Sequence, residues 1–166
     1  MAPPNVANLE LRPAGPDDEQ FLFTLYASTR ELELALLPLS DAEKEAFLRM
    51  QFDAQRRHYA AHYQPAAHDL VLVEGEAVGR LYVVRDEHQI LVVDVALLPE
   101  HRGRGIGSAL LTALIAEAGA AGKTVSVHVQ HQNPARRLYE RLGFVTVADQ
   151  GMYVRLERRA YEKTAS

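Results

Sequence analysis

The sequence predicts an α/β fold, a mixed and mostly antiparallel sheet flanked by about four helices. Two observations lead to this fold class. The hydrophobic periodicity changes from helical to alternating near Asp69, so helices dominate before this residue and strands after it. In addition, residues 90–98 are apolar at every position except Asp94, which is typical of a central strand covered on both faces.

The N-terminal part predicts one strand and two helices. A strand is expected over 9–12, and a helix then starts with Asp17 and Gln20 spaced as a capping pair. The apolar stripe of this helix consists of Phe21, Leu22, Leu25 and Leu32. A capping box at 40–43 opens a longer helix that extends to about Tyr63.

The longer helix is apolar on two sides, which implies two contacts. One side carries Phe47, Met50, Ala54 and Ala61, and the other carries Leu48, Phe52, Tyr59 and Tyr63. The core is the favoured second contact. A substrate pocket and a subunit partner, as in a homodimer, are the alternatives.

Downstream of Asp69 the sequence predicts six strands and two helices. The strands are expected over residues 70–73, 77–84, 90–98, 125–129, 144–148 and 152–157. One helix follows the third of these strands and ends at Gly122. The other starts at Asn133, an N-cap residue before Pro134, and runs to Leu142.

Length and composition limit the function class. The chain has 166 residues, and we expect one domain over 1–166 with a flexible tail at 1–8. The formal net charge is −4, so no overall field favours nucleic acid or an anionic membrane as a partner. The absence of cysteine excludes disulfides and thiolate metal ligands. Without a signal-peptide pattern or a bilayer-spanning apolar run, we expect a cytoplasmic protein.

A glycine-rich turn with two arginines, residues 102–108, connects the apolar strand to the next helix. Its glycines at 103, 105 and 107 allow a ligand to approach the backbone closely. The first turn of the helix presents amides that have no intrahelical partner. Together with the positive end of the helix dipole, these amides favour an anion such as a phosphate.

Three phosphate-binding patterns compete for this turn. A P-loop requires Gly-Lys-Ser/Thr, but no lysine lies between the turn and Lys123. A dinucleotide-binding turn requires a third glycine where Ser108 stands. The third pattern, Arg/Gln-x-x-Gly-x-Gly/Ala after an apolar strand, is met by Arg102, Gly105 and Gly107.

Through this third pattern the chain resembles the GNAT superfamily of acyl-coenzyme A-dependent N-acyltransferases. The resemblance is strong from Asp69 to about Glu157 and rests on two motifs, VDVALLPEHRGRGIG at 93–107 and NPARRLYERLGF at 133–144. It implies a GNAT-like fold with a splayed parallel strand pair at the centre of the sheet. It also implies acetyl-CoA, or another acyl-CoA, as co-substrate and no metal. Residues 69–158 are then the acyl-CoA-binding core, and 13–68 form the acceptor-side helical region.

The resemblance also implies where acyl-CoA binds. The strand ending at Leu97 separates from the strand starting at Thr124, and the pantetheine arm enters between them. The pyrophosphate is expected on the amides of about 102–108. The implied cofactor-binding residues are Val95, Ala96, Leu97, Arg102, Gly103, Arg104, Gly105, Ile106, Gly107, Ser108, Asn133 and Tyr139.

Two side chains are candidates for catalysis. Tyr139 stands six residues after Asn133, where the family has its general-acid tyrosine, and is expected to protonate the leaving thiolate. Asp94 is the best-placed general base for the amine, with His128 as the runner-up. A purely structural role is the alternative for Asp94, Tyr139 and Asn133. Asp94 would be hydrogen-bonded by backbone or an arginine, Tyr139 would pack at the helix end, and Asn133 would act only as a helix cap.

The expected acceptor is a primary amine of a small molecule or peptide. Glu31, Glu33 and His128 are candidate substrate-binding residues, and Asp53 lies in the same acceptor-side region as the two glutamates. Two alternatives to an N-acetyltransferase stay open. One is a non-catalytic acyl-CoA sensor on the same fold. The other is a metal site formed by His58 and His62, one helical turn apart, with His68 or another histidine as a third ligand, although no His-Glu-x-x-His motif accompanies them.

Overall fold

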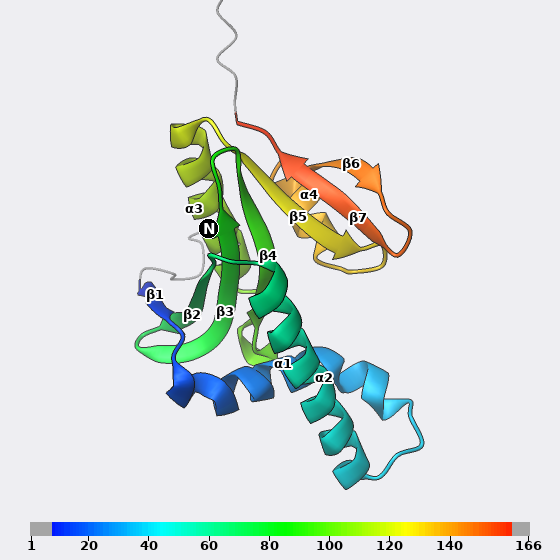
Figure 1. The fold of residues 1–166 in the computed structure, drawn as a ribbon. Helices are drawn as coiled ribbons and strands as arrows, with labels where there is room; N and C mark the ends of the chain where they lie inside the picture. Colours follow the sequence, from blue (N-terminus) through cyan, green and yellow to red (C-terminus); the bar gives the residue numbers. More distant parts are fainter. Residues whose placement is uncertain (1–7, 161–166) are drawn as a thin grey trace, which may run out of the picture.

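The computed structural model describes residues 8–160 and shows a mixed sheet with helices on both faces (Figure 1). The seven strands lie in the order β1-β2-β3-β4-β5-β7-β6, and every neighbouring pair is antiparallel except β4 and β5. This confirms the predicted fold class. Of the predicted tail at 1–8, residues 1–7 lie outside the described range.

The strands are β1 (Leu9–Pro13), β2 (Ala67–Val73), β3 (Glu76–Arg85), β4 (Gln89–Leu97), β5 (Thr124–Gln130), β6 (Val145–Asp149) and β7 (Tyr153–Arg158). The helices are α1 (Glu19–Ala35), α2 (Asp41–His62), α3 (Ile106–Ala121) and α4 (Arg136–Arg141), with short 3-10 helices η1 (Pro16–Asp18) and η2 (Pro99–His101).

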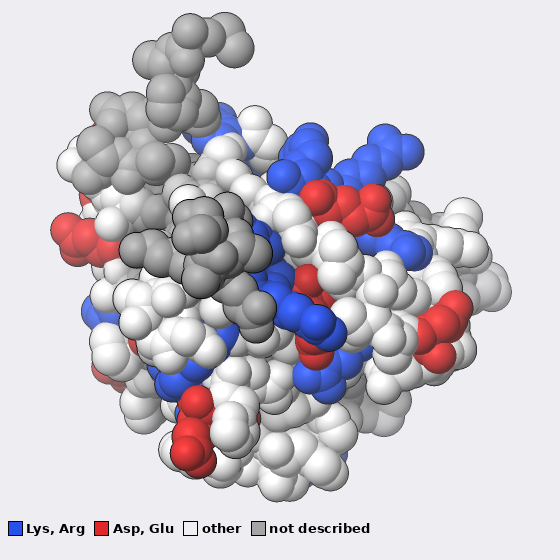
Figure 2. Space-filling model, turned by 90° about the horizontal axis from the view of Figure 1, so that it is seen from above, with Lys and Arg blue, Asp and Glu red and all other residues white. Residues whose placement is uncertain are grey.

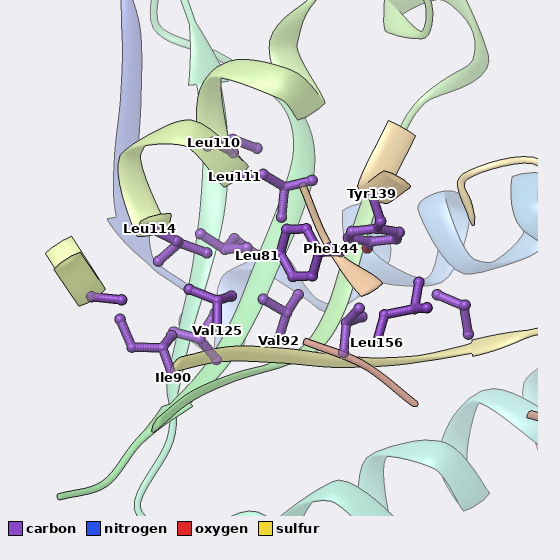
Figure 3. Packing of buried hydrophobic residues seen from close by; sticks show 14 of the residues in the cluster. Leu81, Ile90, Val92, Leu110, Leu111, Leu114, Val125, Tyr139, Phe144 and Leu156 are labelled. Carbon is purple, nitrogen blue, oxygen red and sulfur yellow. The ribbon is translucent and has the colours of Figure 1, made fainter. Parts of the chain in front are cut away.

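Two hydrophobic clusters hold the helices to the sheet. The larger one lies between the sheet and α3, where Leu111 of α3, Ile90 of β4 and Val125 of β5 are fully buried (Figure 3). The smaller one joins α1 and α2 to β2, and Phe52 of α2 meets Phe23 of α1 edge-on at 5.5 Å between ring centroids. The central strands are therefore covered on both faces, as their apolar sequences predict.

Helix α1 differs from the prediction at its start and in its stripe. The carboxylate of Asp18 accepts a hydrogen bond from the Gly15 amide (2.8 Å), so residues 16–18 form η1 and α1 starts at Glu19; the predicted Asp17 cap is wrong. Leu32 is 86% exposed, whereas Leu34 is buried with the α2 residues of the smaller cluster. The buried stripe thus follows the side of α1 that packs on α2.

Helix α2 starts with the predicted capping box. The Ser40 hydroxyl accepts from the Glu43 amide (3.2 Å), and the Glu43 carboxylate accepts from the Ser40 amide (3.1 Å). One apolar side of the helix packs in the core, and on the other side Phe47 packs partly against the smaller cluster. Leu48 and Phe52 are buried on the first side, whereas Met50 is 59% exposed on the other. The favoured prediction, that the core covers both sides, therefore holds in part for Phe47 and is wrong for Met50, Ala54 and Ala61, which are exposed.

Helix α4 is shorter than predicted. The Asn133 side-chain oxygen accepts from the Ala135 amide (2.9 Å), so Asn133 caps a turn and regular helix starts only at Arg136. The β2–β3 turn is also tighter than expected. It consists of Glu74 and Gly75 alone, whose φ values of 52° and 83° fit a two-residue hairpin.

The surface carries charges of both signs. On the face shown in Figure 2, basic and acidic side chains are interspersed. Ion pairs connect neighbours of opposite charge, for example Arg85 with Glu117 (2.6 Å) and Arg12 with Asp18 (3.0 Å). Within residues 8–160, no helix combines the length and the apolar character needed to cross a membrane.

His68 of β2 is expected to make stability depend on pH. Its Nε2 is buried and has no hydrogen-bond partner within residues 8–160, and its ring lies 4.8 Å from that of Tyr82. Burial, assisted by the charge of Arg80, lowers the pKa of His68 to about 4. Because the unfolded chain takes up this proton near pH 6.5, the free energy of unfolding should fall by about 1–2 kcal/mol as the pH drops from 6.5 to 4, after allowance for partial exposure.

The measurement is urea unfolding between pH 4 and pH 7. His68→Phe keeps an aromatic ring against Tyr82 and removes the titrating group, so it is expected to reduce the slope of stability against pH in this window. Contributions of carboxylates cancel when the two proteins are compared. Equal slopes for the variant and the wild-type protein would contradict this assignment.

Candidate active site

Strands β4 and β5 pair over only four residues. Gln89–Val92 lie opposite Thr124–Val127, and beyond Val92 the two strands diverge (Figure 1). The edge of β4 from Val93 to Leu97 on the β5 side therefore has no strand partner. This parallel pair, splayed at the centre of the sheet, is the one that the sequence predicts.

A β-bulge turns Asp94 away from the core of the larger cluster. In β4, Ile90 and Val92 face α3, so regular alternation would place Asp94 on the same face. The register with β3 shifts by one residue between Val92 and Asp94, which makes Val93 the extra residue. Asp94 therefore lies on the α2 face of the sheet, where it meets Arg80 of β3, which in turn bonds to Gln55 of α2.

The glycine turn lies at the end of β4. Gly103 and Gly105 have φ values of 72° and 83°, a region that other residues rarely adopt. The first bond inside α3 runs from the Ala109 amide to the Gly105 carbonyl (3.0 Å), so the amides of 106–108 have no intrahelical acceptor. The dipole of this 16-residue helix adds to their positive character. The turn is therefore able to bind an anionic group, although the Ile106 side chain itself is buried in the core.

The two arginines of the turn lie in different surroundings. Arg102 donates from Nε to the Leu97 carbonyl (2.9 Å) and from a terminal nitrogen to the Ser28 hydroxyl of α1 (3.4 Å). It thus connects the end of β4 to α1. Arg104 is exposed. A role of either arginine in phosphate binding stays a prediction.

Tyr139 of α4 is buried in the larger hydrophobic cluster, on the face of the sheet that α3 covers. It is 3% exposed and packs edge-on against Phe144 at 5.3 Å between ring centroids (Figure 3). Its hydroxyl makes no hydrogen bond with residues 8–160. Burial and, to a smaller extent, the negative charge of Asp94 raise the pKa of Tyr139, so the phenol keeps its proton at neutral pH.

Asp94 is bound by Arg80, a residue that sequence reasoning missed. The Nε of Arg80, on β3, donates to Oδ2 of Asp94 (2.9 Å), and a terminal nitrogen of Arg80 bonds to the same oxygen. That nitrogen also donates to Oε1 of Gln55 on α2 (2.8 Å). The signal in the sequence is an arginine within the apolar strand 77–84, one strand before an equally isolated aspartate. The structural alternative for Asp94 is realised here, while its role as a base stays a prediction.

His128 lies on the sheet face opposite α3. It is directly across from Arg155 of β7, and Val127 and Val129 on either side of it point into the core. Partial burial and, secondarily, the charge of Arg155 lower the pKa of His128, so its ring is neutral at pH 7 and able to accept a proton.

A groove of about 630 Å³ lies between α1, the start of α2 and η2. Glu31 lines it, whereas Glu33 lies outside it and pairs with Arg30 (3.4 Å). Asp53 pairs weakly with Arg56 (4.0 Å), away from this groove. Of the acidic candidates for binding an amine, Glu31 is therefore the one that lines this groove. The other charged residues of the lining are Asp41, Lys44, Glu45 and Glu100.

The histidines do not form a metal site in the described part of the chain. His58 and His62 stack at 4.2 Å between ring centroids, but His68 packs on Tyr82 of β3. Within residues 8–160, no three potential metal ligands come together.

Comparisons with known proteins agree with this geometry. The model of the acetyltransferase (GNAT) family matches residues 26–144, more than half of the chain. Curated protein sequences gave no match. Among solved structures, PaiA N-acetyltransferase from Thermoplasma acidophilum in complex with coenzyme A has a TM-score of 0.68 at 16% identity, covering 91% of this chain and 98% of that one. An acetyltransferase from Thermus thermophilus has a TM-score of 0.65 at 24% identity, covering 92% and 97%. The likenesses show the fold, and the family match shows that this chain belongs to the GNAT acetyltransferase family.

Proposed function

We propose that the protein transfers an acetyl group from acetyl-CoA to a primary amine of a small molecule or peptide, with both substrates bound at once. The observation that carries the proposal is the gap between β4 and β5, which opens next to the glycine turn at the start of α3. The site chemistry fits an acyl-CoA. Unpaired backbone at 93–97 suits the amides of a pantetheine arm, and the free amides of 106–108 suit a pyrophosphate. The space next to the Cα atom of Gly103 is open, since an added Cβ would meet no atom within 4 Å.

The amine must lose a proton to react. An aliphatic amine with a pKa of about 10.4 is neutral in only about one molecule in 2,500 at pH 7, a handicap of about 4.6 kcal/mol. In the proposed reaction Asp94 accepts the proton that the ammonium form must lose, and the nitrogen lone pair then attacks the thioester carbonyl carbon. The further proton on the new amide nitrogen passes to solvent. His128, neutral and on the same sheet face, is the second candidate for accepting the ammonium proton.

The leaving group also needs a proton. When the C–S bond breaks, the electron pair stays on sulfur, and a thiolate in a partly dry gap is unfavourable. Tyr139 is protonated at neutral pH and has no hydrogen-bond partner within residues 8–160, so its hydroxyl is available to donate to the sulfur. The family match supports this role for Tyr139, and its hydroxyl has no competing hydrogen bond within residues 8–160.

Acetyl-CoA is expected to raise the melting temperature, because a ligand that binds only the folded state stabilises it. At 100 times its Kd the gain is about 2.7 kcal/mol, or roughly 5–10 °C for a chain of this size. ATP and NAD at the same concentration should give no shift. Gly105→Val should abolish the acetyl-CoA shift, since valine strains the left-handed backbone at the helix start and covers the amides. No shift with acetyl-CoA or any other acyl-CoA would refute the proposal.

Turnover separates an enzyme from a non-catalytic sensor. Release of CoA thiol can be followed with a thiol-reactive dye, and the chain contains no cysteine that would react with it. The amines to test are lysine, a diamine, benzylamine and a short peptide with a free N-terminus. Thiol release that depends on the amine supports the enzyme, whereas a thermal shift without release for any amine supports the sensor.

A further inference from the structure

The ion pair between Arg80 and Asp94 lies where charge is costly. The Arg80 side chain is 7% exposed and that of Asp94 is 26% exposed. Tyr82, two positions along β3 and therefore on the same face as Arg80, is 7% exposed. Removing two charges from water commonly costs more than their attraction returns, and apolar replacements of such pairs are often neutral or stabilising. Fold stability alone is therefore a weak reason for this pair.

The hydrogen bonds around Asp94 are distributed unevenly over its two oxygens. Both donor nitrogens of Arg80 bond to Oδ2. No residue within 8–160 donates a hydrogen bond to Oδ1. One oxygen of the carboxylate is thus fixed by the protein, while the other stays available to a donor from outside.

Arg80 is itself fixed from helix α2. Gln55 accepts from its terminal nitrogen (2.8 Å), and the ring of Tyr59 lies 5.7 Å from the guanidinium carbon. Tyr59 in turn packs against Tyr82 of β3 at 5.1 Å between ring centroids. The guanidinium is therefore held between a strand and a helix, which limits the orientations that Asp94 can adopt.

We infer that Arg80 is a positioning residue: held by Gln55, it fixes Oδ2 of Asp94 and presents Oδ1 to the acceptor amine. The inference rests on the proposed function. Arg80 touches neither substrate in this scheme and acts only through Asp94. Its removal should therefore matter for the transfer step and leave acetyl-CoA binding unchanged.

The test is a double-mutant cycle on turnover with Arg80→Met, Asp94→Asn and the double variant. We expect Arg80→Met to lower kcat about tenfold in the wild-type background and less than twofold in the Asp94→Asn background. The KM for acetyl-CoA and the acetyl-CoA thermal shift should stay within twofold of wild type. Activities are measured by thiol release with the best amine of the panel, at least 10 °C below the lowest melting temperature of the set.

Two further variants control for a loss of kcat that is caused by a damaged fold. Arg57→Met removes an exposed arginine from α2 and should leave kcat and KM unchanged. Gln55→Ala keeps the ion pair but removes the support of Arg80 from α2, so it should lower kcat about threefold, again only when Asp94 is present. This milder variant applies the same test if Arg80→Met does not fold.

An equal loss of kcat in both backgrounds, or no loss in either, would overturn the inference while leaving the proposed function intact. Absence of thiol release by the wild-type protein with every amine would instead refute the proposed function, and the positioning role with it. A loss of kcat confined to the background that retains Asp94 supports the inference.

Discussion

Tyr139→Phe is expected to lower kcat for acetyl transfer by about 100-fold, the lower end of the range for general acid catalysis. The thiolate then leaves without a proton donor. Binding and folding should be retained, because the ring keeps its contact with Phe144 and the lost hydroxyl has no hydrogen-bond partner within residues 8–160. Steady-state thiol release gives kcat, and the thermal shift with acetyl-CoA checks that the variant still binds.

A matched control is available on β7. Tyr153 is 45% exposed, and Tyr153→Phe removes the same hydroxyl at a position that the proposed mechanism does not use. This control should keep wild-type kcat. If Tyr139→Phe also keeps kcat within twofold of wild type from pH 6 to pH 9, the tyrosine is a packing residue and the proton reaches sulfur by another route.

Gly79→Ala is expected to destabilise the fold by about 3 kcal/mol, which corresponds to a melting temperature lower by roughly 6–12 °C. Gly79 of β3 lies opposite Leu97 at the end of β4. A Cβ at this position would collide with the Ala96 carbonyl oxygen and lie 2.7 Å from Cδ2 of Leu97. Because the backbone of a paired strand cannot move aside as a flexible side chain can, β3 must separate from the end of β4, and this displaces the stretch of β4 whose other edge is proposed to bind acyl-CoA. The acetyl-CoA thermal shift should therefore shrink as well.

Gly119→Ala is the matched control for this prediction. Gly119 is exposed on α3, and a Cβ there would meet no atom within 4 Å. Alanine favours a helix by about 1 kcal/mol over glycine, so this variant should melt slightly higher than wild type and bind acetyl-CoA normally. A melting temperature of Gly79→Ala within 1 °C of wild type would contradict the prediction and show that the backbone at the end of β4 shifts at little energetic cost.

Local patterns made the fold and the glycine turn predictable from the sequence. The capping box at Ser40 and the apolar run of β4 each act over a few residues and have the predicted consequence in the structure. The glycines of 103–107 precede α3 as predicted, while phosphate binding by this turn stays a prediction. The parallel arrangement of β4 and β5 came from the family resemblance, since no local pattern reports which strands pair.

The surroundings of the candidate catalytic residues could not be predicted in this way. The bulge at Val93 cannot be seen in a strand whose residues do not alternate between apolar and polar, yet it decides which face receives Asp94. The partner of Asp94 comes from β3 and its support from α2, so the cluster depends on contacts between distant segments. The same holds for Arg102, which bonds to α1 across more than 70 positions of the chain.

The short ladder between β4 and β5 also gives the sheet a free edge in its interior, in addition to the outer edges at β1 and β6. A free edge normally invites a strand from another molecule and so promotes aggregation. Under the proposed function, a thin, linear ligand carrying amide groups suits this edge better than a polypeptide strand with side chains on both faces. Acyl-CoA then completes the sheet by acting as the strand that the protein lacks.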